Sequence, residues 1–130
     1  MMKVFLGLSV MLIASMSMVA HAGNLKQGKK LYRTHCVACH QAKGQGIPGA
    51  FPPLASSDYL MADKQRAISV PLKGLQGKIT VNGTDYNGMM PPFAQLSDQD
   101  IADIMTYVMG SWGNAGEAVT VDEVAQARAN

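Results

Sequence analysis

The segment Cys36-Val37-Ala38-Cys39-His40 constrains this chain more than any other feature, because it holds the only two cysteines among 130 residues. Two cysteines separated by two residues and followed directly by histidine form the attachment motif of c-type haem. The thiols can reach two vinyl groups on one side of a porphyrin, and the next residue turns its imidazole toward the iron. The sequence therefore predicts one covalent haem c, with its iron, attached to Cys36 and Cys39 and ligated by His40.

The N-terminal residues predict export. Lys3 precedes an uncharged apolar run from Val4 to Ala20, and Ala20-His21-Ala22 has the small-x-small form of a signal-peptidase site. We expect residues 1–22 to be a signal peptide and residues 23–130 to form one mature domain in the bacterial periplasm, with no membrane insertion after cleavage. The alternative is an uncleaved membrane anchor, although the apolar run is at the short limit for a spanning helix.

Three other roles fit the two cysteines less well. A structural zinc ion needs about four ligands, and beyond residue 22 the chain offers only adjacent or near-adjacent candidates, namely His35, Cys36, Cys39 and His40. A thioredoxin-like pair requires a βαβ unit around the motif, and the sequence contains no such pattern. A disulfide between the two cysteines would close a tight, strained loop and leave the following histidine without a role.

Composition and charge limit the class of protein. Hydrophobic residues make up 48% of the chain and charged residues 15%, which excludes a disordered chain, and a net charge of +2 gives no support to nucleic-acid binding. Residues 23–80 contain nine Lys and Arg against two Asp, whereas residues 81–130 contain one Arg against seven acidic residues. The basic residues either form a rim that steers an acidic redox partner or are solvated surface charges; the rim would comprise Lys26, Lys29, Lys30, Arg33, Lys43 and Lys78.

Hydrophobic periodicity predicts four helices. From Asn24 to His35, one face carries Leu25, Gly28, Leu31 and Tyr32. A second helix begins after the N-cap Ser97, ends at Gly113, and has apolar positions at Ile101, Ile104, Met105, Val108 and Trp112. Shorter helices are expected from about Asp63 to Leu72, where Pro71 should shorten or kink the helix, and from Val121 to Ala129 after the cap Thr120.

Glycine and proline interrupt the middle of the chain. Residues 44–92 contain seven glycines and six prolines, so we expect mainly loops there. Asn82-Gly83 between two β-prone triplets, residues 79–81 and 84–86, predicts a short hairpin. Because a haem would supply the apolar core that such loops lack, the patterns predict an all-α fold: three to five helices wrapped around one covalent haem, with long Gly/Pro-rich loops and one short hairpin.

The second axial ligand of the iron is expected in the run from Tyr86 to Phe93. Met89 and Met90 lie there in a proline-stiffened loop, and a thioether opposite histidine raises a haem's reduction potential. The alternative role for both is core packing, the commoner fate of methionine. Spacing alone does not choose between Met89 and Met90.

The residues from Leu25 to Trp112 resemble those of class I c-type cytochromes. Gly28 and Tyr32, together with Tyr107, resemble the crossing of the first and last helices in that family. The segment Pro52-Pro53-Leu54 resembles the family's Pro-x-Leu after the haem motif. The resemblance implies the cytochrome c fold for residues 23–130.

The same resemblance assigns two further site residues. It implies that the backbone carbonyl of Pro52 accepts a hydrogen bond from His40, which would orient the imidazole and raise its donor strength. It also favours Met90 over Met89 as the axial ligand, because the family's methionine directly precedes a proline. Residues 44–54, 77–83 and 111–114 further resemble the cytochrome domain fused to some copper nitrite reductases and small cytochrome subunits of periplasmic dehydrogenases. Pro71 departs from the family's pattern, in which the helix around this residue usually continues toward a glycine that corresponds to Gly74.

An iron with His40 and Met90 in both axial positions has no open site for a substrate, so we expect one-electron transfer and no enzymatic activity. The predicted protein carries electrons between redox proteins, which include a nitrite reductase, an oxidase or a dehydrogenase as candidates. Two alternatives stay open. The chain is a cytochrome subunit permanently docked in a larger oxidoreductase rather than a free monomer, or a haem enzyme or sensor with an open axial site.

Overall fold

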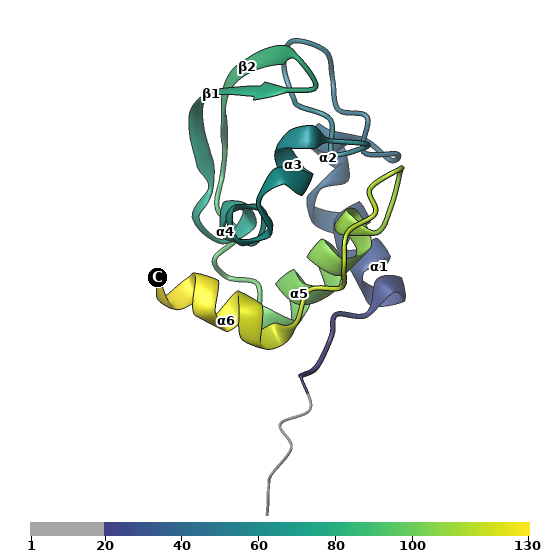
Figure 1. Ribbon diagram of the computed structural model, residues 1–130, viewed down its shortest axis with the longest axis vertical. Helices are drawn as coiled ribbons and strands as arrows, with labels where there is room; N and C mark the ends of the chain where they lie inside the picture. Colours follow the sequence, from purple (N-terminus) through teal and green to yellow (C-terminus); the bar gives the residue numbers. More distant parts are fainter. Residues whose placement is uncertain (1–19) are drawn as a thin grey trace, which may run out of the picture.

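The computed structural model describes residues 20–130, in which six α-helices pack together and a two-stranded antiparallel sheet lies at one end of the molecule (Figure 1). The elements in chain order are α1 (Leu25–His35), α2 (Val37–His40), α3 (Asp58–Ala62), α4 (Lys64–Lys73), β1 (Leu75–Val81), β2 (Thr84–Met90), α5 (Asp98–Met109) and α6 (Val121–Ala129). Nearly all of the predicted signal peptide lies outside the described residues. Within residues 20–130, no helix is long and apolar enough to cross a membrane.

Helices α1 and α5 cross at a glycine. A Cβ added at Gly28 would lie 1.9 Å from the carbonyl oxygen of Asp103 and 2.9 Å from the Cβ of Tyr107, so only glycine allows this approach. Next to the crossing, Tyr32 is 1% exposed, and its ring meets those of Tyr107 and Trp112 with centroids 5.6 and 5.1 Å away. The predicted contact between the first helix and the helix that begins at Asp98 is therefore confirmed.

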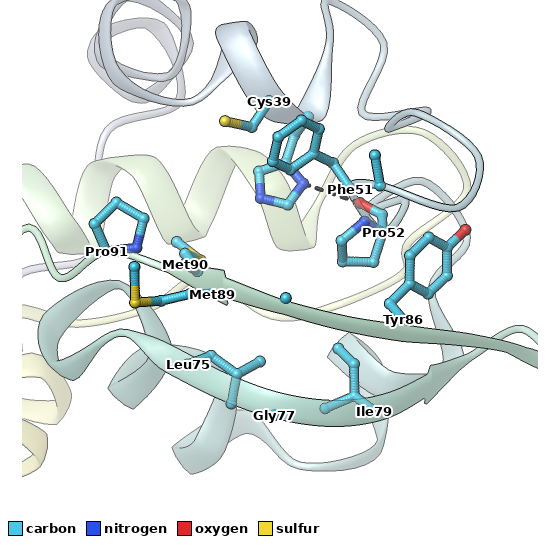
Figure 2. A pocket seen from close by; sticks show the side chains of 13 residues that line it. Cys39, Phe51, Pro52, Leu75, Gly77, Ile79, Tyr86, Met89, Met90 and Pro91 are labelled. Atoms are coloured by element: carbon cyan, nitrogen blue, oxygen red, sulfur yellow. Dashed lines mark hydrogen bonds between the residues drawn. The ribbon is translucent and has the colours of Figure 1, made fainter.

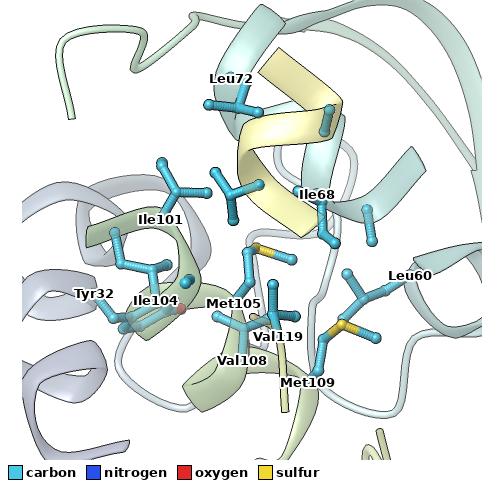
Figure 3. Close-up of a cluster of buried hydrophobic side chains, with 14 residues drawn as sticks. Tyr32, Leu60, Ile68, Leu72, Ile101, Ile104, Met105, Val108, Met109 and Val119 are labelled. Carbon is cyan, nitrogen blue, oxygen red and sulfur yellow. The ribbon is translucent and has the colours of Figure 1, made fainter. Parts of the chain in front are cut away.

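The hydrophobic core lies between α1, α4, α5 and α6 (Figure 3). Its centre is formed by side chains that are less than 2% exposed, and these include Ile68 from α4, Ile101 from α5 and Val124 from α6. Met105 and Met109 belong to this cluster, and Met61 packs against it, as the sequence predicts for methionines on helices. Leu25, predicted on the buried face of α1, is instead 57% exposed because it lies in the first turn, beyond the crossing.

Helix α6 is tied across the ends of α4 and α5. Thr120 caps it at the predicted residue in a capping box with Glu123. The Lys64 Nζ lies 2.7 Å from the Glu123 carboxylate, and the Arg128 Nε lies 2.7 Å from Asp98 Oδ1. The C-terminal helix thus closes the core on the side away from the hairpin (Figure 1).

The glycine- and proline-rich middle of the chain contains more regular structure than predicted. The hairpin does turn at Asn82-Gly83, but it pairs seven residues on each side, from Val81↔Thr84 to Leu75↔Met90. Met89 and Met90 therefore end strand β2 and do not lie in a loop, and the mostly helical fold contains a longer hairpin than the short one predicted. Backbone pairing fixes the strands here although two glycines, Gly77 and Gly88, interrupt them.

Three helices also differ from prediction. Helix α3 was not predicted; Ser57 caps it with a hydrogen bond from the amide of Leu60. Helix α4 continues through Pro71 to Lys73, since a proline late in a helix removes one N–H donor without ending it at once. Helix α5 ends at Met109, and Trp112 lies in the following turn with φ 52°, where its ring still packs on the aromatic cluster.

Candidate haem-binding site

One cavity opens between the hairpin and the segment around α2 (Figure 2). The empty space in it, counting the open mouth, is about 640 Å³. The lining residues include no Asp, Glu, Lys or Arg: Cys39, His40, Ala50, Phe51, Pro52, Leu75, Gly77, Ile79, Tyr86, Gly88, Met89, Met90 and Pro91. The cavity thus suits a large apolar group and contains few atoms that would bind a polar one.

His40 projects from the wall formed by α2. Cys36 separates α1 from α2 and lets the chain continue in a short helix that ends at His40. The imidazole is 8% exposed, and its Nδ1 lies 3.0 Å from the carbonyl oxygen of Pro52. Because a carbonyl can only accept, Nδ1 carries the proton and Nε2 keeps a free lone pair in the neutral ring. Burial lowers the pKa of His40, although the hydrogen bond to Pro52 opposes that effect.

The loop from 41 to 57 holds the Pro52 carbonyl in place. Gly44 has φ +64° and lies so close to the Trp112 indole that a Cβ would meet it at 2.5 Å. The amide of Leu54 donates to the carbonyl of Gly44 at 2.7 Å. Asn114, which is 6% exposed, donates to the carbonyls of Leu54 and Val108 and accepts from the amide of Ser57. These contacts fix the wall beside His40 to the end of α5.

The hairpin forms the facing wall. Side chains of a strand alternate between its two faces, so the cross-strand pairs Leu75↔Met90, Gly77↔Gly88 and Ile79↔Tyr86 share the face toward the cavity. Met89 belongs to the opposite face by this alternation and is 70% exposed, although it is also among the lining residues. The alternation distinguishes two adjacent methionines that sequence spacing left equivalent.

The paired glycines leave bare backbone in the middle of this wall. A Cβ at Gly77 would meet nothing within 4 Å, and one at Gly88 would meet only the carbonyl oxygen of Ala50, at 4.0 Å. A flat apolar group can lie against such a surface, with one nitrogen donor and one sulfur donor on the two walls. The residues present therefore fit a haem.

The two cysteines differ in their surroundings. Both thiols are free. Cys39 lines the cavity, whereas Cys36 packs at the edge of the hydrophobic core and is not among the lining residues. Burial, together with the nearby Cys39, raises the pKa of Cys36 to about 11. Among residues 20–130, no group of three or more His, Cys, Asp or Glu side chains is arranged to hold a metal ion.

The predicted residues Cys39, His40, Pro52 and Met90 thus come together at one cavity, although they span two walls and fifty residues of sequence. Prediction from the sequence missed the apolar lining from β1 and from Phe51. The alternation of apolar or small residues at positions 75, 77, 79 and 81 is the signal that would have extended the hairpin and identified this wall. Prediction from the sequence also missed Asn114, whose hydrogen bonds support the wall beside His40.

A chain whose helices pack through a glycine crossing, and whose Cys-x-x-Cys-His segment faces a methionine across an apolar cavity, has the features of a c-type cytochrome. The profile of the cytochrome c family matches residues 25–112, and this protein belongs to that family. Members of the family bind covalent haem c through iron-ligating and thioether-forming residues of this kind.

Individual relatives narrow the comparison. The chain is 44% identical over 111 residues to cytochrome c-552 of Thermus thermophilus, and the match covers 78% of this chain and 84% of that protein. It is 34% identical over 107 residues to the gluconate 2-dehydrogenase cytochrome c subunit of Pantoea cypripedii, covering 78% of this chain and 24% of the subunit. It is also 29% identical over 91 residues to cytochrome c6 of Cyanidium caldarium, covering 70% and 74%.

Proposed function

We propose that this protein is a periplasmic one-electron carrier in which Cys36 and Cys39 attach one haem c and His40 and Met90 occupy its two axial positions. The observation that carries the proposal is that His40 and Met90 line opposite walls of one uncharged cavity. When bound, the haem takes up one electron as ferric iron becomes ferrous and gives it up again without making or breaking a covalent bond. The chain's own residues exclude water, orient the imidazole and supply the thioether.

Replacing each methionine in turn tests the axial assignment. In Met90→Ala, we expect the weak long-wavelength absorption of a methionine–ferric iron bond to disappear and the reduction potential to fall, since His/Met ligation raises it. Met89→Ala is the matched control, because the side chain belongs to the solvent-facing set of β2 and is 70% exposed. An unchanged spectrum and potential in Met90→Ala would instead indicate an open axial site, as in a haem enzyme or sensor.

A basic face on α1 supports docking to an acidic redox partner. Lys26, Lys29, Lys30 and Arg33 recur at three- and four-residue spacings on this helix, which leads directly into Cys36. All four are exposed, and within residues 20–130 none of them belongs to an ion pair. By contrast, Lys78, also predicted in the rim, pairs with Asp85 at 2.8 Å. The four residues of the α1 face, like Lys43 in the predicted rim, are therefore not compensated by an ion pair within residues 20–130.

Electron-transfer kinetics at varied salt concentration test this docking. Steering by opposite charges predicts that the second-order rate constant falls as ionic strength rises. The double variant Lys29→Glu/Lys30→Glu should lower that rate constant about tenfold at low salt, and Lys78→Glu should change it little. A rate constant that is independent of salt, in the wild type and in both variants, would remove the electrostatic docking.

The dehydrogenase subunits among the relatives support a second candidate, in which the protein is permanently docked in a larger oxidoreductase. The size of the native complex distinguishes the two. A free carrier elutes as a monomer when it is purified from its host, whereas a subunit co-elutes with the other chains of the enzyme at every ionic strength that leaves the enzyme intact.

A further inference from the structure

The side chain of Arg128, near the C-terminus, makes three hydrogen bonds around the start of α5. Its Nε donates to Asp98 Oδ1 at 2.7 Å, its Nη1 to the carbonyl oxygen of Ala94 at 2.9 Å, and its Nη2 to the carbonyl oxygen of Leu96 at 2.7 Å. Two of the three acceptors belong to residues 91–97, the segment that connects Met90 to α5. We call these residues the connecting segment.

The first half of the connecting segment is anchored to α4 and α1. The amide of Phe93 donates to the carbonyl of Pro71 at 2.8 Å, and the Phe93 ring lies 6.1 Å from that of His35 in an edge-to-face arrangement. In the second half, Leu96 packs against the hydrophobic core and its amide donates to the Phe93 carbonyl at 3.0 Å. Ala94 and Gln95 are exposed, and within residues 20–130 Arg128 is the only side chain that hydrogen-bonds to Ala94 or Leu96.

A displacement of this second half would be passed on to Met90 because the chain between them is stiff. Pro91 and Pro92 directly follow Met90, and each proline ring fixes its own φ angle. Behind them, a Cβ on Gly74 would lie 2.6 Å from the carbonyl oxygen of Met90, so the methionine backbone has little room to move independently. The connecting segment runs from the hairpin toward α6 (Figure 1).

We propose that Arg128 is a positioning residue for Met90: by holding Ala94 and Leu96, α6 keeps the connecting segment, and with it the thioether, against the cavity. The inference rests on the proposed axial role of Met90. A guanidinium suits this task because its planar fork can donate to several acceptors at once, and its charge strengthens each of these hydrogen bonds. The last helix of the chain thus controls the iron ligand that lies more than thirty residues earlier in sequence.

Two measurements on the haem-loaded protein test the proposal with the variant Arg128→Gln. The long-wavelength methionine–iron absorption of the ferric protein should disappear on heating well before the far-UV circular dichroism of the helices does, whereas in the wild type the two transitions lie closer together. In addition, the backbone amide of Leu96, which donates to the Phe93 carbonyl at 3.0 Å, should exchange its hydrogen at least about tenfold faster than in the wild type, since the turn that it closes loses the hydrogen bonds from Arg128 to the carbonyls of Ala94 and Leu96.

Two control variants separate positioning from general stability. Lys64→Gln also releases α6, by removing the pair with Glu123 and the bond to the Ala118 carbonyl, but Lys64 does not contact the connecting segment. Asp98→Asn removes the ion pair of Arg128 and keeps both carbonyl bonds. Both controls should shift the two thermal transitions together.

The outcomes distinguish the inference from the proposed function. If Arg128→Gln shifts both transitions equally, or if Lys64→Gln separates them as much, the positioning role is wrong while the ligation by Met90 stands. If the wild-type ferric protein lacks the methionine–iron absorption, the axial role of Met90 is wrong and the inference fails with it. If the two transitions separate only in Arg128→Gln, and the Leu96 amide exchanges faster there, the positioning role of Arg128 is supported.

Discussion

The helical core and the haem cavity are built from the same kinds of side chains but are closed in different ways. In the core, residues such as Ile68, Ile101 and Val124 are completely or almost completely buried by one another (Figure 3). In the cavity, Leu75, Ile79 and Phe51 line a space that no other part of residues 20–130 fills (Figure 2). Because apolar surface that faces water is unfavourable, the core stabilises itself, whereas the cavity depends on the group it binds.

Replacing both proposed haem attachment residues should produce the largest difference between the cavity and the helical core. In Cys36→Ala/Cys39→Ala, the cavity would lose its covalent filling, and we expect a loss of at least about 4 kcal/mol of unfolding free energy, comparable to a ligand present at about 1,000 times its Kd. Denaturant unfolding followed by circular dichroism measures the loss. Amide hydrogen exchange should show that β1 and β2 lose protection while α5 keeps some; equal protection of both regions at wild-type stability would contradict the difference between them.

A pair of glycine substitutions compares the two regions directly. Gly28→Ala would place a methyl group 1.9 Å from the Asp103 carbonyl oxygen, so we expect a loss of about 3 kcal/mol or more from forced separation of α1 and α5. Gly88→Ala, whose new methyl group would meet nothing closer than 4.0 Å within residues 20–130, should cost less than about 1 kcal/mol when both variants are compared without haem, because in the loaded protein the methyl group would occupy the surface left for the haem. Thermal unfolding of both variants checks the difference, and equal effects would show that the crossing is not the tighter site.

A smaller effect is expected where the two regions meet. The Tyr32 hydroxyl, from the core side, donates to the carbonyl of Gln41 at 2.7 Å, directly after His40. Tyr32→Phe keeps the ring and leaves that carbonyl without its partner, so we expect a loss of about 1 kcal/mol in chemical denaturation. Tyr59→Phe is a control outside this junction, since its ring still packs under the Arg66 guanidinium. An effect of Tyr59→Phe as large as that of Tyr32→Phe would argue against a specific junction.

Acid should lower the stability of the helical core slightly, because it weakens the attachment of α6 to α4. Burial raises the pKa of Glu123, but the hydrogen bonds from Lys64 and Thr120 outweigh it and hold the pKa below its ordinary value of 4.5. A carboxylate with a lowered folded pKa contributes stability above its unfolded pKa and loses it as pH falls through the folded one. As the pH falls below about 5, we expect the free energy of unfolding to decrease by about 0.5 kcal/mol. Glu123→Gln should remove this pH-dependent component; an unchanged slope in that variant would assign the acid effect to other groups.

The elements that the sequence predicted well are those with local signals. The cap at Thr120 and the cap at Ser97 each satisfy orphan amides of their own helix, and the turn at Asn82-Gly83 depends on two adjacent residues with positive φ. The attachment motif is local as well. No long-range contact is needed to recognise any of these features.

The elements that the sequence predicted poorly depend on partners far away in the chain. Strands β1 and β2 extend to Leu75 and Met90 because each residue finds a hydrogen-bonding partner across the sheet, which overrides the glycines. Trp112 has the spacing of a helical residue but leaves the helix to pack on Tyr32 and Gly44. Its position is decided by the aromatic cluster and not by helical periodicity.

The sequence by itself predicted a haem and proposed which histidine and cysteines would attach it, since these residues lie within five consecutive positions whose geometry is local. It also narrowed the second ligand to two adjacent methionines. Only the tertiary structure decided which methionine faces His40, because the face of a strand is set by its pairing register. The tertiary structure also places Arg128 against the segment after Met90, because α6 packs on elements that are distant from it in the sequence.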